Sequence, residues 1–331
     1  MVTLEQAAEY LRAAQDVLVL SHQYPDGDTL GSAFALVRTL QRMGKRARFA
    51  CSHAIGKPYR FLEETVEKQS FEPKCVVTVD VAAPSLLGEP VRSRWGNRVD
   101  LSLDHHGSGK EFARMTVVEP GAAAAAEVIY ELLPLLGVEP DRETAACLYA
   151  GIATDTGGFR FPNTTPRTMR IAASLMEAGI DAAELNRLLL DTKSRAFLEL
   201  ERLSLGSMRF FFGGRCALIV VTRDMLRASG AREDETDALP PLARRVEGVL
   251  AGVTLREKEN GDFRVSVRTV PGVNAAKICE TLGGGGHRGA AGCTVRRPQG
   301  ADPAGEAAAL VVRAVGEYLR KKGIDTKEES E

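Results

Sequence analysis

The sequence predicts an α/β protein whose N-terminal domain contains a mainly parallel sheet flanked by helices. Three short apolar runs, DVLVLSH from Asp16, CVVTVDV from Cys75 and VDLSLDHH from Val99, are typical of buried strands. Between them lie segments with helical spacing, such as TLGSAFALVRTLQRMG from Thr29. This alternation of strands and helices favours βαβ units, in which successive strands run parallel.

The helical pattern continues after the third strand and then changes. The segments 119–137, 141–155 and 164–179 have helical spacing, and the last has a capping Thr, a Pro in its first turn and a terminal Gly. We expect the alanine tract 122–126 to lie in a close-packed helix. Residues 181–208 predict one long helix, and residues 208–222 predict a hairpin of strands around a Gly-Gly pair.

This change of pattern predicts two domains. With 331 residues, of which 44% are hydrophobic, the chain is long enough to build two cores. We place an N-terminal domain at 1–190, a helical linker at 191–205, a smaller α/β domain at 206–320 and a charged tail at 321–331.

The composition argues against several classes of protein. The 43 basic and 44 acidic residues leave a net charge of −1, which offers no overall field for a long polyanion. The six cysteines form no C-x-x-C pair, which argues against structural zinc or a disulfide framework and favours reduced thiols. Glu5 and Glu9 stand where a signal peptide would be basic and then apolar, and no apolar run reaches the roughly 20 residues of a membrane span. We therefore expect a soluble, cytoplasmic protein without membrane partners.

Histidine and aspartate residues recur where the predicted strands and helices end or begin. The stretch SHQYPDGDTLGSA contains His22, Asp26 and Asp28, although its Pro-Asp-Gly alone is most simply explained as a turn with a capping Asp. The other apolar runs are followed by residues of the same kind: Asp80, Asp104, His105, His106 and Asp155. Ligands of open parallel sheets bind outside the carboxyl ends of the strands, so we expect these side chains to meet at one edge.

Such a concentration of acids predicts bound metal ions. Carboxylates packed together raise one another's pKa values unless a cation compensates their charge. Imidazole and carboxylate ligands without thiolates favour two Mn²⁺ ions, with Mg²⁺ or Co²⁺ as alternatives and Zn²⁺ able to occupy the same ligands in vitro. Asp26 and Asp28 are two apart in a segment that we interpret as extended, so each can hold a different ion. Two ions roughly 3.5 to 4 Å apart can activate water for an in-line displacement at phosphorus.

Taken in order along the chain, these motifs resemble those of the DHH phosphoesterase family. The resemblance is to the RecJ-like branch with a DHH-associated C-terminal domain, and in particular to bacterial nanoRNases that act on oligoribonucleotides and on 3′-phosphoadenosine 5′-phosphate (pAp). It covers nearly the whole chain and rests on HQYPDGDTLGS, the strand before Asp80, DHH, TDTGGFRFPNTTPRTMRIAA, VSVRT and GGGGHRGAAGCTV. It implies a catalytic domain at 1–190 and a substrate-binding domain at 206–320.

The resemblance also implies a role for each polar residue. It implies two metal sites that share one bridging residue, with His22, Asp26 and Asp80 in the first and Asp28, Asp80, His105 and Asp155 in the second. His106 is then expected to be the acid or phosphate-binding group near the leaving oxygen. Asp104 is expected to orient its neighbours.

A glycine run in the second predicted domain is the other candidate binding element. Residues 283–286 alone would be a flexible turn, but His287 and Arg288 follow them and Arg268 lies on an earlier predicted strand. Glycine lets backbone N–H groups approach a phosphate, and Arg and His add charge-assisted hydrogen bonds. The resemblance implies that this domain holds the non-scissile phosphate or the terminal nucleotide through Arg268, Gly284, Gly285, Gly286, His287 and Arg288.

The resemblance implies a hydrolase that attacks a phosphorus held between its two domains. The expected substrates are pAp, converted to AMP and phosphate, and short RNA of about two to five nucleotides, released as nucleoside 5′-monophosphates, because long strands would need a basic track. The alternatives are a cyclic-dinucleotide or linear dinucleotide phosphodiesterase, a RecJ-like single-strand exonuclease, and a nucleotide-binding regulatory module without catalysis. We expect no binding of long duplex nucleic acid, and we expect a homodimer from family habit.

Several further residues carry weaker expectations. Tyr24, Leu86 and Gly109 stand where relatives often have Asn, Arg and Asn, and these departures bear on substrate preference. We interpret His53 as a loop histidine. The adjoining residues Lys57, Tyr59 and Arg60 are weaker candidates for contact with the substrate.

Two aromatic segments are interpreted as structural. We expect Trp95 to anchor the surface and Phe210–Phe212 to form a core strand.

Overall fold

The structure is a computed structural model that describes residues 1–107 and 111–326. It divides into two compact units, Met1–Thr192 and Lys193–Glu331, which we call unit 1 and unit 2. Each unit has its own sheet and its own hydrophobic cores. The domain boundaries predicted from the sequence stay a prediction, and Gly109 and residues 327–331 of the predicted tail lie outside the described residues.

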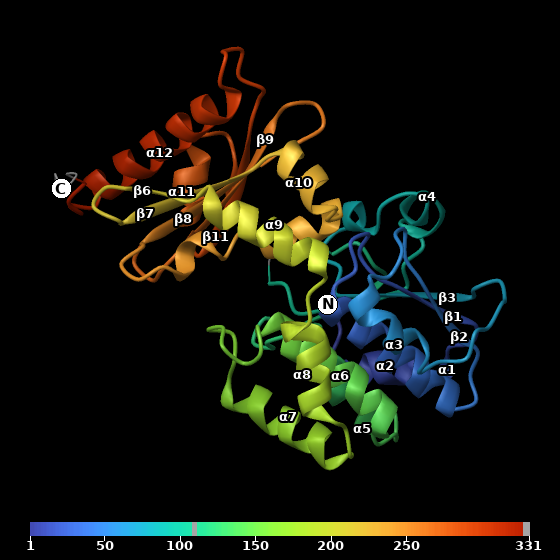
Figure 1. Ribbon diagram of the computed structural model, residues 1–331. Coiled ribbons are helices and arrows are strands. Elements are labelled where there is room, and N and C mark those ends of the chain that lie inside the picture. Colours follow the sequence, from blue (N-terminus) through green and yellow to red (C-terminus); the bar gives the residue numbers. More distant parts are fainter. Residues whose placement is uncertain (108–110, 327–331) are drawn as a thin grey trace. The chain divides into compact units, whose positions relative to one another are not determined.

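Unit 1 is built on a five-stranded sheet in which every neighbouring pair is parallel (Figure 1). The order of the strands is β2-β1-β3-β4-β5. Their bounds are β1 (Val17–Leu20), β2 (Ala47–Ala50), β3 (Cys75–Val79), β4 (Leu101–Asp104) and β5 (Met115–Val118). The predicted α/β class with a parallel sheet is therefore confirmed, and the carboxyl ends of β1, β3 and β4 lie side by side.

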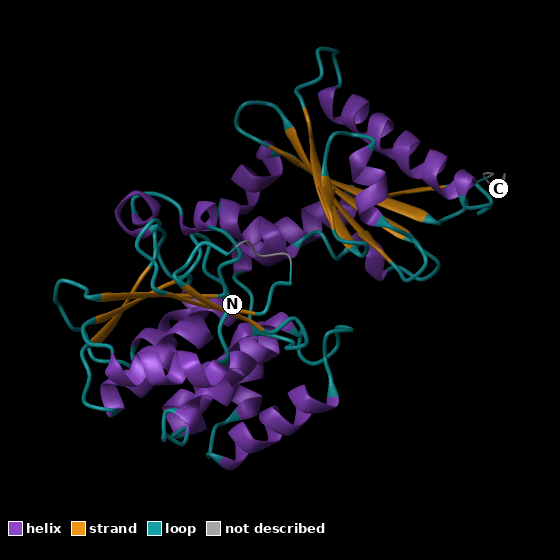
Figure 2. Cartoon of the chain, turned by 180° about the vertical axis from the view of Figure 1, so that it is seen from behind, coloured by secondary structure: helices purple, strands orange, loops and turns teal. Residues whose placement is uncertain are grey.

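Helices cover both faces of this sheet. Their bounds are α1 (Leu4–Ala13), α2 (Gly27–Arg42), η1 (Lys57–Tyr59), α3 (Arg60–Glu63), η2 (Pro84–Leu87), α4 (Val91–Trp95), α5 (Ala125–Leu135), α6 (Arg142–Asp155), α7 (Pro166–Glu177), α8 (Ala182–Asn186) and η3 (Arg187–Asp191). Side chains alternate along β1, so Val17 and Val19 join the main core with α1, α2, α5 and α6, while Leu18 and Leu20 join a smaller core with η2 and α4. In Figure 2, the main helical layer of unit 1 lies against one face of the sheet of that unit.

Unit 2 contains a mixed six-stranded sheet in the order β10-β11-β9-β8-β7-β6. Its strands are β6 (Arg209–Phe211), β7 (Cys216–Val221), β8 (Ala251–Glu257), β9 (Phe263–Thr269), β10 (Gly285–Gly286) and β11 (Ala290–Val295). Its helices are α9 (Arg195–Gly206), α10 (Arg223–Ser229), η4 (Glu233–Ala238), η5 (Ala243–Arg245), α11 (Ala275–Glu280) and α12 (Pro303–Lys321). β6 and β7 form the predicted hairpin, β7 and β8 are parallel, and the cores on the two faces involve α11 with α12 and α9 with α10.

The start of α2 differs from the sequence interpretation. Asp26 is the N-cap of the helix, and its side chain accepts hydrogen bonds from the N–H groups of Asp28 and Thr29. Asp28 therefore lies in the first helical turn and not in an extended segment. The reason is that Gly27 begins the helix immediately after a good capping residue, so the helix starts two residues earlier than the apolar periodicity indicated.

Two expected helices are interrupted or shortened. The alanine tract is only partly helical, because α5 begins at Ala125 and Ala124 is its extended N-cap. The long helix expected over 181–208 is broken between Asp191 and Arg195. The hydroxyl of Thr192 bonds back to the carbonyl of Arg187, and the hydroxyl of Ser194 caps α9 by accepting from the N–H of Phe197. These local hydrogen bonds compete with a continuous helix.

The expectation for Trp95 was wrong, and the expectation of a core strand at Phe210–Phe212 was wrong for Phe210, since Phe211 and Phe212 pack against a core of unit 2. Trp95 is only 4% exposed, and it packs in the smaller core of unit 1 with the guanidinium groups of Arg94 and Arg98 over its ring. Phe210 is 51% exposed because it lies on β6, the edge strand of its sheet.

The helix α7 has the predicted Thr165 cap and begins at Pro166.

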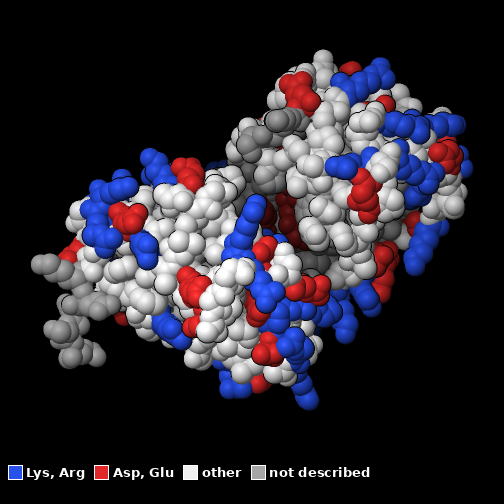
Figure 3. Space-filling model, turned by 90° about the horizontal axis from the view of Figure 1, so that it is seen from above, with Lys and Arg blue, Asp and Glu red and all other residues white. Residues whose placement is uncertain are grey.

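The described surface carries both signs of charge. Lys and Arg side chains are interspersed with Asp and Glu on the face drawn in Figure 3, in keeping with the net charge of −1. Across residues 1–107 and 111–326, no helix combines the length and the apolar character that a membrane crossing requires.

Candidate functional site

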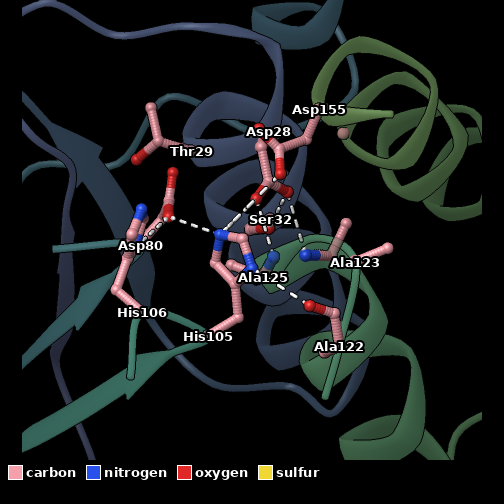
Figure 4. A network of polar contacts seen from close by, with 12 residues as sticks. Asp28, Thr29, Ser32, Asp80, His105, His106, Ala122, Ala123, Ala125 and Asp155 are labelled. Carbon is pink, nitrogen blue, oxygen red and sulfur yellow. Dashed lines mark hydrogen bonds and ion pairs between the residues drawn. The ribbon is translucent and has the colours of Figure 1, made fainter. Parts of the chain in front are cut away.

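The candidate site lies where strands of unit 1 end and two helices meet them. His22 follows β1, Asp80 follows β3 directly, and Asp104 is the last residue of β4. Because these strands are parallel neighbours, their polar ends share one edge of the sheet. Figure 4 shows that Asp28 from α2 and Asp155 from the end of α6 point toward His105, which follows β4.

Asp80 lies between two sets of side chains. Its Oδ2 is 3.8 Å from Nε2 of His22, and its Oδ1 is 3.6 Å from Nε2 of His105. The residue has a φ of 57°, in the left-handed region that only short polar residues and glycine adopt readily. It is 5% exposed, and among the described residues its Oδ1 has no hydrogen-bond partner. A buried carboxylate oxygen without a partner is costly unless a cation binds it.

The first set consists of His22, Asp26 and Asp80. Nε2 of His22 is 3.7 Å from Oδ2 of Asp26, and one ligand atom from each of the three residues lies within 4.8 Å of the others. Oδ1 of Asp26 is already used as the cap of α2, which leaves Oδ2 directed at His22. The cap therefore fixes how this carboxylate is presented.

The second set consists of Asp28, His105 and Asp155. Nε2 of His105 is 3.9 Å from Oδ2 of Asp28 and 3.9 Å from Oδ2 of Asp155. The three ligand atoms again lie within 4.8 Å of one another. Asp80 approaches this set as well, through the contact with His105 described above. The six side chains expected to hold metal thus come together in two sets, with Asp80 adjoining both.

Backbone N–H groups at the start of α5 hold Asp28 in place. The N–H of Ala125 donates to its Oδ2 at 2.6 Å, and the N–H of Ala126 donates to its Oδ1 at 2.9 Å. The hydroxyl of Ser32, one turn further along α2, also donates to Oδ1 at 3.2 Å. The end of the alanine tract therefore supports Asp28, because the N–H groups at a helix N-terminus favour a negative charge.

The carbonyl of Ala122 fixes the tautomer of His105. Nδ1 of His105 lies 3.2 Å from this carbonyl oxygen, which can only accept, so Nδ1 carries the proton. Nε2 is then left with its lone pair facing the carboxylates. This is the usual arrangement of a metal-binding imidazole and its outer hydrogen bond.

Asp104 and His106 form a hydrogen-bonded pair beside Asp80, and together with Asp80 and His105 they offer a third set of ligand atoms within 4.8 Å of one another. Oδ1 of Asp104 accepts from Nδ1 of His106 at 2.8 Å and from the backbone N–H groups of His105 and His106. The hydrogen bond with Asp104, and then its charge, raise the pKa of His106 above its ordinary value. Nδ1 of His106 also lies 3.4 Å from Oδ1 of Asp80.

The pKa values of the carboxyl groups fit a site for cations. Burial, followed by repulsion from Asp155 and Asp26, raises the pKa of Asp28 well above its usual value. Burial, followed by repulsion from the neighbouring carboxylates, does the same to the pKa of Asp80, and burial raises the pKa of Asp155. Bound divalent cations would remove this mutual repulsion and satisfy the unpartnered Oδ1 of Asp80. The residues present therefore suit a metal centre.

Close packing of α2 on α6 brings Asp28 to Asp155. A Cβ on Gly31 would lie 2.3 Å from the carbonyl oxygen of Cys147, and a Cβ on Gly151 would lie 2.9 Å from Oδ1 of Asp28. A Cβ on Gly27 would likewise clash with the side chain of Thr154. Glycines four apart on α2 therefore let two helix backbones approach closely, a signal that was present in the sequence.

Asn163 is a second feature that the sequence reasoning missed. Its Nδ2 donates to the carbonyl of Ala123 at 2.9 Å and to the carbonyl of Asp155 at 3.1 Å. One side chain thus joins the loop that supports His105 and Asp28 to the end of α6. The only sequence signal was its place in the FPNTTP segment that follows Asp155.

The candidate binding residues of unit 2 lie on β9 and on β10 with the loop that follows it, and β11 lies between these two strands. Arg268 on β9 pairs with Ala290 on β11, and the N–H of His287 donates to the carbonyl of Ala290. Arg288 is exposed, as is His287. Burial, followed by repulsion from Arg264 and Arg244, lowers the pKa of Arg268, a situation that a bound anion would relieve.

At two positions of this run, the packing or the backbone conformation requires glycine. A Cβ on Gly284 would lie 2.3 Å from the carbonyl oxygen of Gly292, and Gly286 has a φ of 142° with β11 against it. Gly285 has open space at its Cβ position. The run forms β10 and its approach, so it is not simply a flexible turn.

Comparisons with known proteins agree with this geometry. The model of the DHH family, N-terminal domain, matches residues 16–152, and the model of the DHHA1 domain matches residues 225–320. The chain is 36% identical to the bifunctional oligoribonuclease and PAP phosphatase NrnA of Thermus thermophilus, over 96% of this chain and 94% of that protein. It is 27% identical to the protein of the same name from Bacillus subtilis, over 85% of this chain and 90% of that protein.

A second group of relatives is longer than this chain. The chain is 27% identical to the cyclic-di-AMP phosphodiesterase GdpP of Geobacillus thermodenitrificans, over 84% of this chain but 44% of that protein.

Solved structures share the fold. An exopolyphosphatase-related protein from Bacteroides fragilis superposes with a TM-score of 0.83 at 21% identity, over 96% of each chain. RecJ from Thermus thermophilus, in complex with Mn²⁺, superposes with a TM-score of 0.50 at 16% identity, over 94% of this chain and 54% of that one. Together with the family matches and the 36% identical relative, these findings place the chain in the DHH phosphoesterase family, as a DHH domain followed by a DHHA1 domain.

Proposed function

We propose that this protein is a metal-dependent hydrolase that cleaves short RNA of about two to five nucleotides to nucleoside 5′-monophosphates and converts pAp to AMP and phosphate. The observation that carries the proposal is the convergence of six His and Asp side chains in two sets around Asp80. The similarity to the oligoribonuclease and PAP phosphatase of Thermus thermophilus over nearly the full length of both chains supports the same substrates.

The proposed cofactors are two Mn²⁺ ions, with Mg²⁺ or Co²⁺ as alternatives. His22, Asp26 and Asp80 would hold one ion, and Asp28, Asp80, His105 and Asp155 would hold the other. Such ions, when bound, lower the pKa of water and stabilise charge on phosphoryl oxygens. The choice of Mn²⁺ is supported by the mixed imidazole and carboxylate donors and by the Mn²⁺ complex of RecJ.

The protein's own groups would orient the substrate and move protons. His106, whose raised pKa keeps it protonated to higher pH, would donate a proton to the leaving oxygen or bind a phosphate oxygen. Asp104 would hold the ring of His106 through Nδ1, so that Nε2 is the nitrogen left for the substrate. The carbonyl of Ala122 would keep Nε2 of His105 available as a ligand.

In unit 2, we propose that the guanidinium of Arg268 and the segment from Gly284 to Arg288, which is exposed from Gly285 onward, bind the non-scissile phosphate or the terminal nucleotide. The proximity of Arg268 to Ala290 and of His287 to the same residue supports this assignment. A planar guanidinium and backbone N–H groups suit a phosphate dianion. Gly285, which is exposed and has open space at Cβ, is the position where the backbone is most accessible.

A cyclic-dinucleotide or linear dinucleotide phosphodiesterase is the second candidate. The similarity to cyclic-di-AMP phosphodiesterases favours it, although this chain spans less than half the length of those proteins. A RecJ-like exonuclease is supported only by the shared fold. A regulatory module without catalysis conflicts with the presence of all six acidic and imidazole groups at the site.

One assay separates these candidates. Purified protein is incubated with RNA of two to ten nucleotides, pAp, cyclic-di-AMP and a long single-stranded DNA, with Mn²⁺, Mg²⁺ or chelator. The proposal predicts Mn²⁺-dependent release of nucleoside 5′-monophosphates from the shortest RNAs and of phosphate from pAp. Turnover of the cyclic dinucleotide alone, or of the long DNA alone, would contradict it, and so would equal rates in chelator.

The cytoplasmic location and the homodimer also remain predictions. Sedimentation of the purified protein at micromolar concentration would measure the state of association directly. We expect a species of twice the mass of the 331-residue chain. A monomer at all concentrations tested would contradict the dimer without affecting the proposed chemistry.

A further inference from the structure

Two stacked rings lie at the edge of the candidate site in unit 1. The ring of Tyr24 lies on the ring of His53, with their centroids 4.8 Å apart and an angle of 18° between their planes. Tyr24 comes from the loop after β1, and His53 comes from the loop after β2. Tyr24 is 71% exposed, and neither hydrophobic core of unit 1 includes it among the described residues. Packing of the core therefore does not account for this aromatic pair.

Hydrogen bonds between three loops hold the stacked pair in position. Nδ1 of His53 donates to the carbonyl of Gln23 at 2.5 Å, and the N–H of Gln23 donates to the carbonyl of Leu86 at 2.7 Å. The hydroxyl of Ser52 donates to the carbonyl of Leu87 at 2.6 Å. These loops follow β1, β2 and β3, which are neighbours in the sheet. The pair is therefore fixed to the carboxyl edge of the sheet.

The pair is close to the first set of candidate metal ligands. Tyr24 is two residues from His22 and two residues from Asp26, so its Cα is at most about 7.6 Å from theirs, because each trans peptide step spans about 3.8 Å. All these residues belong to unit 1, so their relation does not depend on unit 2. The backbone of Tyr24 therefore lies next to the first set of candidate metal ligands.

An exposed, fixed aromatic ring beside a phosphate site suits a nucleobase. Bases stack on aromatic side chains whatever their sequence, since every base has a π-face. A ring that is already held by a neighbour loses little conformational freedom when a base lies on it. Tyrosine also tolerates exposure to water better than phenylalanine, because its hydroxyl stays hydrated.

We propose that Tyr24, backed by His53, is the platform on which the base of the substrate nucleotide next to the scissile phosphate stacks. The inference rests on the proposed function for the class of substrate, and it adds a base-recognition subsite to the phosphate chemistry. Stacking without hydrogen bonds to base edges gives tolerance of sequence, with stronger binding of purines than of pyrimidines.

The test compares two substrates that differ only in the base. These are pAp and the 1-O-methyl ribose 3,5-bisphosphate, which carries the same phosphates without adenine. Tyr24→Ala is expected to lower kcat/KM for pAp about tenfold, mainly through KM, as loss of an aromatic ring from a stacked base does. The preference of the enzyme for pAp over the base-free substrate should fall by the same factor, and Tyr24→Trp should retain it.

The control is Phe210→Ala, which removes a similarly exposed aromatic ring from β6 of unit 2. We expect this variant to leave kcat/KM for both substrates at the parental values. If Tyr24→Ala slows both substrates equally, or weakens Mn²⁺ binding, the residue supports His22 and Asp26 and the platform is refuted. If the parent enzyme hydrolyses neither pAp nor short RNA, the proposed function itself fails. If the parent is active but Tyr24→Ala keeps the parental preference for pAp over the base-free substrate, only the platform fails.

Discussion

Asp80 is the residue at which both sets of candidate ligands meet. Its two carboxylate oxygens approach His22 and His105 separately, and its backbone has a left-handed φ of 57°. A buried carboxylate in this position is unfavourable by itself, which is why its pKa is raised by burial and then by its acidic neighbours. The residue makes physical sense as a ligand shared by two cations.

Replacement of Asp80 by Asn should therefore abolish most of the activity. Loss of an outer hydrogen bond to a metal ligand costs about 10- to 100-fold, so loss of a ligand shared by two ions should cost more than about 100-fold in kcat/KM. The measurement is Mn²⁺-dependent hydrolysis of a two-nucleotide RNA. Asp224→Asn, an exposed carboxylate on α10, is the matched control and should retain parental activity. Full activity of the Asp80 variant would refute the shared-ligand role.

Asn163 should act through the residues that it joins. Asn163→Ala removes the hydrogen bonds to the carbonyls of Ala123 and Asp155. We expect the apparent affinity for Mn²⁺ to fall about tenfold, with a smaller loss of kcat once metal is saturating. Asn97→Ala, an exposed position after α4, serves as control. An unchanged Mn²⁺ titration for the Asn163 variant would show that this side chain does not position the site.

At the scale of elements, the contact between α2 and α6 is what brings acids from distant segments together. Gly151 lies against Oδ1 of Asp28 and the Cβ of Ala126, so α2, α5 and α6 meet at one point. The helix N-terminus of α5 then supplies the N–H groups that fix Asp28. The close approach of α2, α5 and α6 therefore also determines how the carboxylate of Asp28 is held.

Gly151→Ala should disturb fold and site together. Its new Cβ would lie 2.7 Å from the Cβ of Ala126 and 2.9 Å from Oδ1 of Asp28, and overpacking of this kind costs about 1 to 3 kcal/mol. We expect a lower Tm by thermal unfolding and a loss of activity. Gly206→Ala, at the end of α9 with open space at Cβ, should leave both near the parental values. A Gly151 variant with the stability and rate of the parent would contradict the close-packing account.

The sequence predicted those elements whose signals are local. The strands before His22, Asp80 and Asp104 were evident as apolar runs, and parallel pairing follows from the intervening helices. The helical position of Asp28 was not evident, because its cap lies within a stretch rich in turn residues. A hydrogen bond accepted by a backbone carbonyl, such as the one from His105 to Ala122, cannot be recognised in the pattern of side chains.

Stacking of Tyr24 on His53 could not be predicted for another reason. It depends on the order β2-β1-β3, which brings loops 21–26 and 51–56 together although about thirty residues separate the two rings. Burial of Trp95 was missed because α4 covers the second face of the sheet, and a short helix of five residues gives little periodicity. Long-range packing decides such cases, not local propensity.

At the scale of the whole molecule, stability should depend on pH in a way that metal ions reverse. The raised pKa values of Asp28 and Asp80 mean that these groups bind protons more tightly in the folded chain than in the unfolded chain, where a carboxyl titrates near about 3.9. Their contribution to stability is therefore fullest below about pH 4 and is lost as the pH rises through the folded values. In metal-free protein, charged carboxylates at neutral pH then oppose folding.

We therefore expect metal-free protein to lose Tm as the buffer is changed from acidic to alkaline, and Mn²⁺ to raise Tm more in the alkaline buffer than in the acidic one. The measurement is thermal unfolding with chelator and with excess Mn²⁺ at each pH. Asp80→Asn should show a smaller drop without metal, because one of the two groups no longer ionises. An equal effect of Mn²⁺ at both values of pH would contradict this reading of the carboxylates.

Unit 2 should affect the binding of substrate without affecting metal. Arg268→Ala is expected to raise KM for pAp by about tenfold or more, since a charge-assisted hydrogen bond to a phosphate contributes roughly 1.5 to 3 kcal/mol. The apparent affinity for Mn²⁺ should stay at the parental value, because the candidate metal ligands all belong to unit 1. Arg320→Ala on α12 is a control of the same charge. A parental KM in the Arg268 variant would remove unit 2 from the proposed phosphate site.

The most direct test of a metal centre bridged by Asp80 is anomalous diffraction at the manganese edge from crystals of the protein grown with Mn²⁺. We expect two peaks in each chain, one within bonding distance of His22 and Asp26, the other within bonding distance of Asp28, His105 and Asp155, with Asp80 touching both. The contrary result would be the absence of peaks at these side chains, or a single peak that leaves Asp80 without a metal.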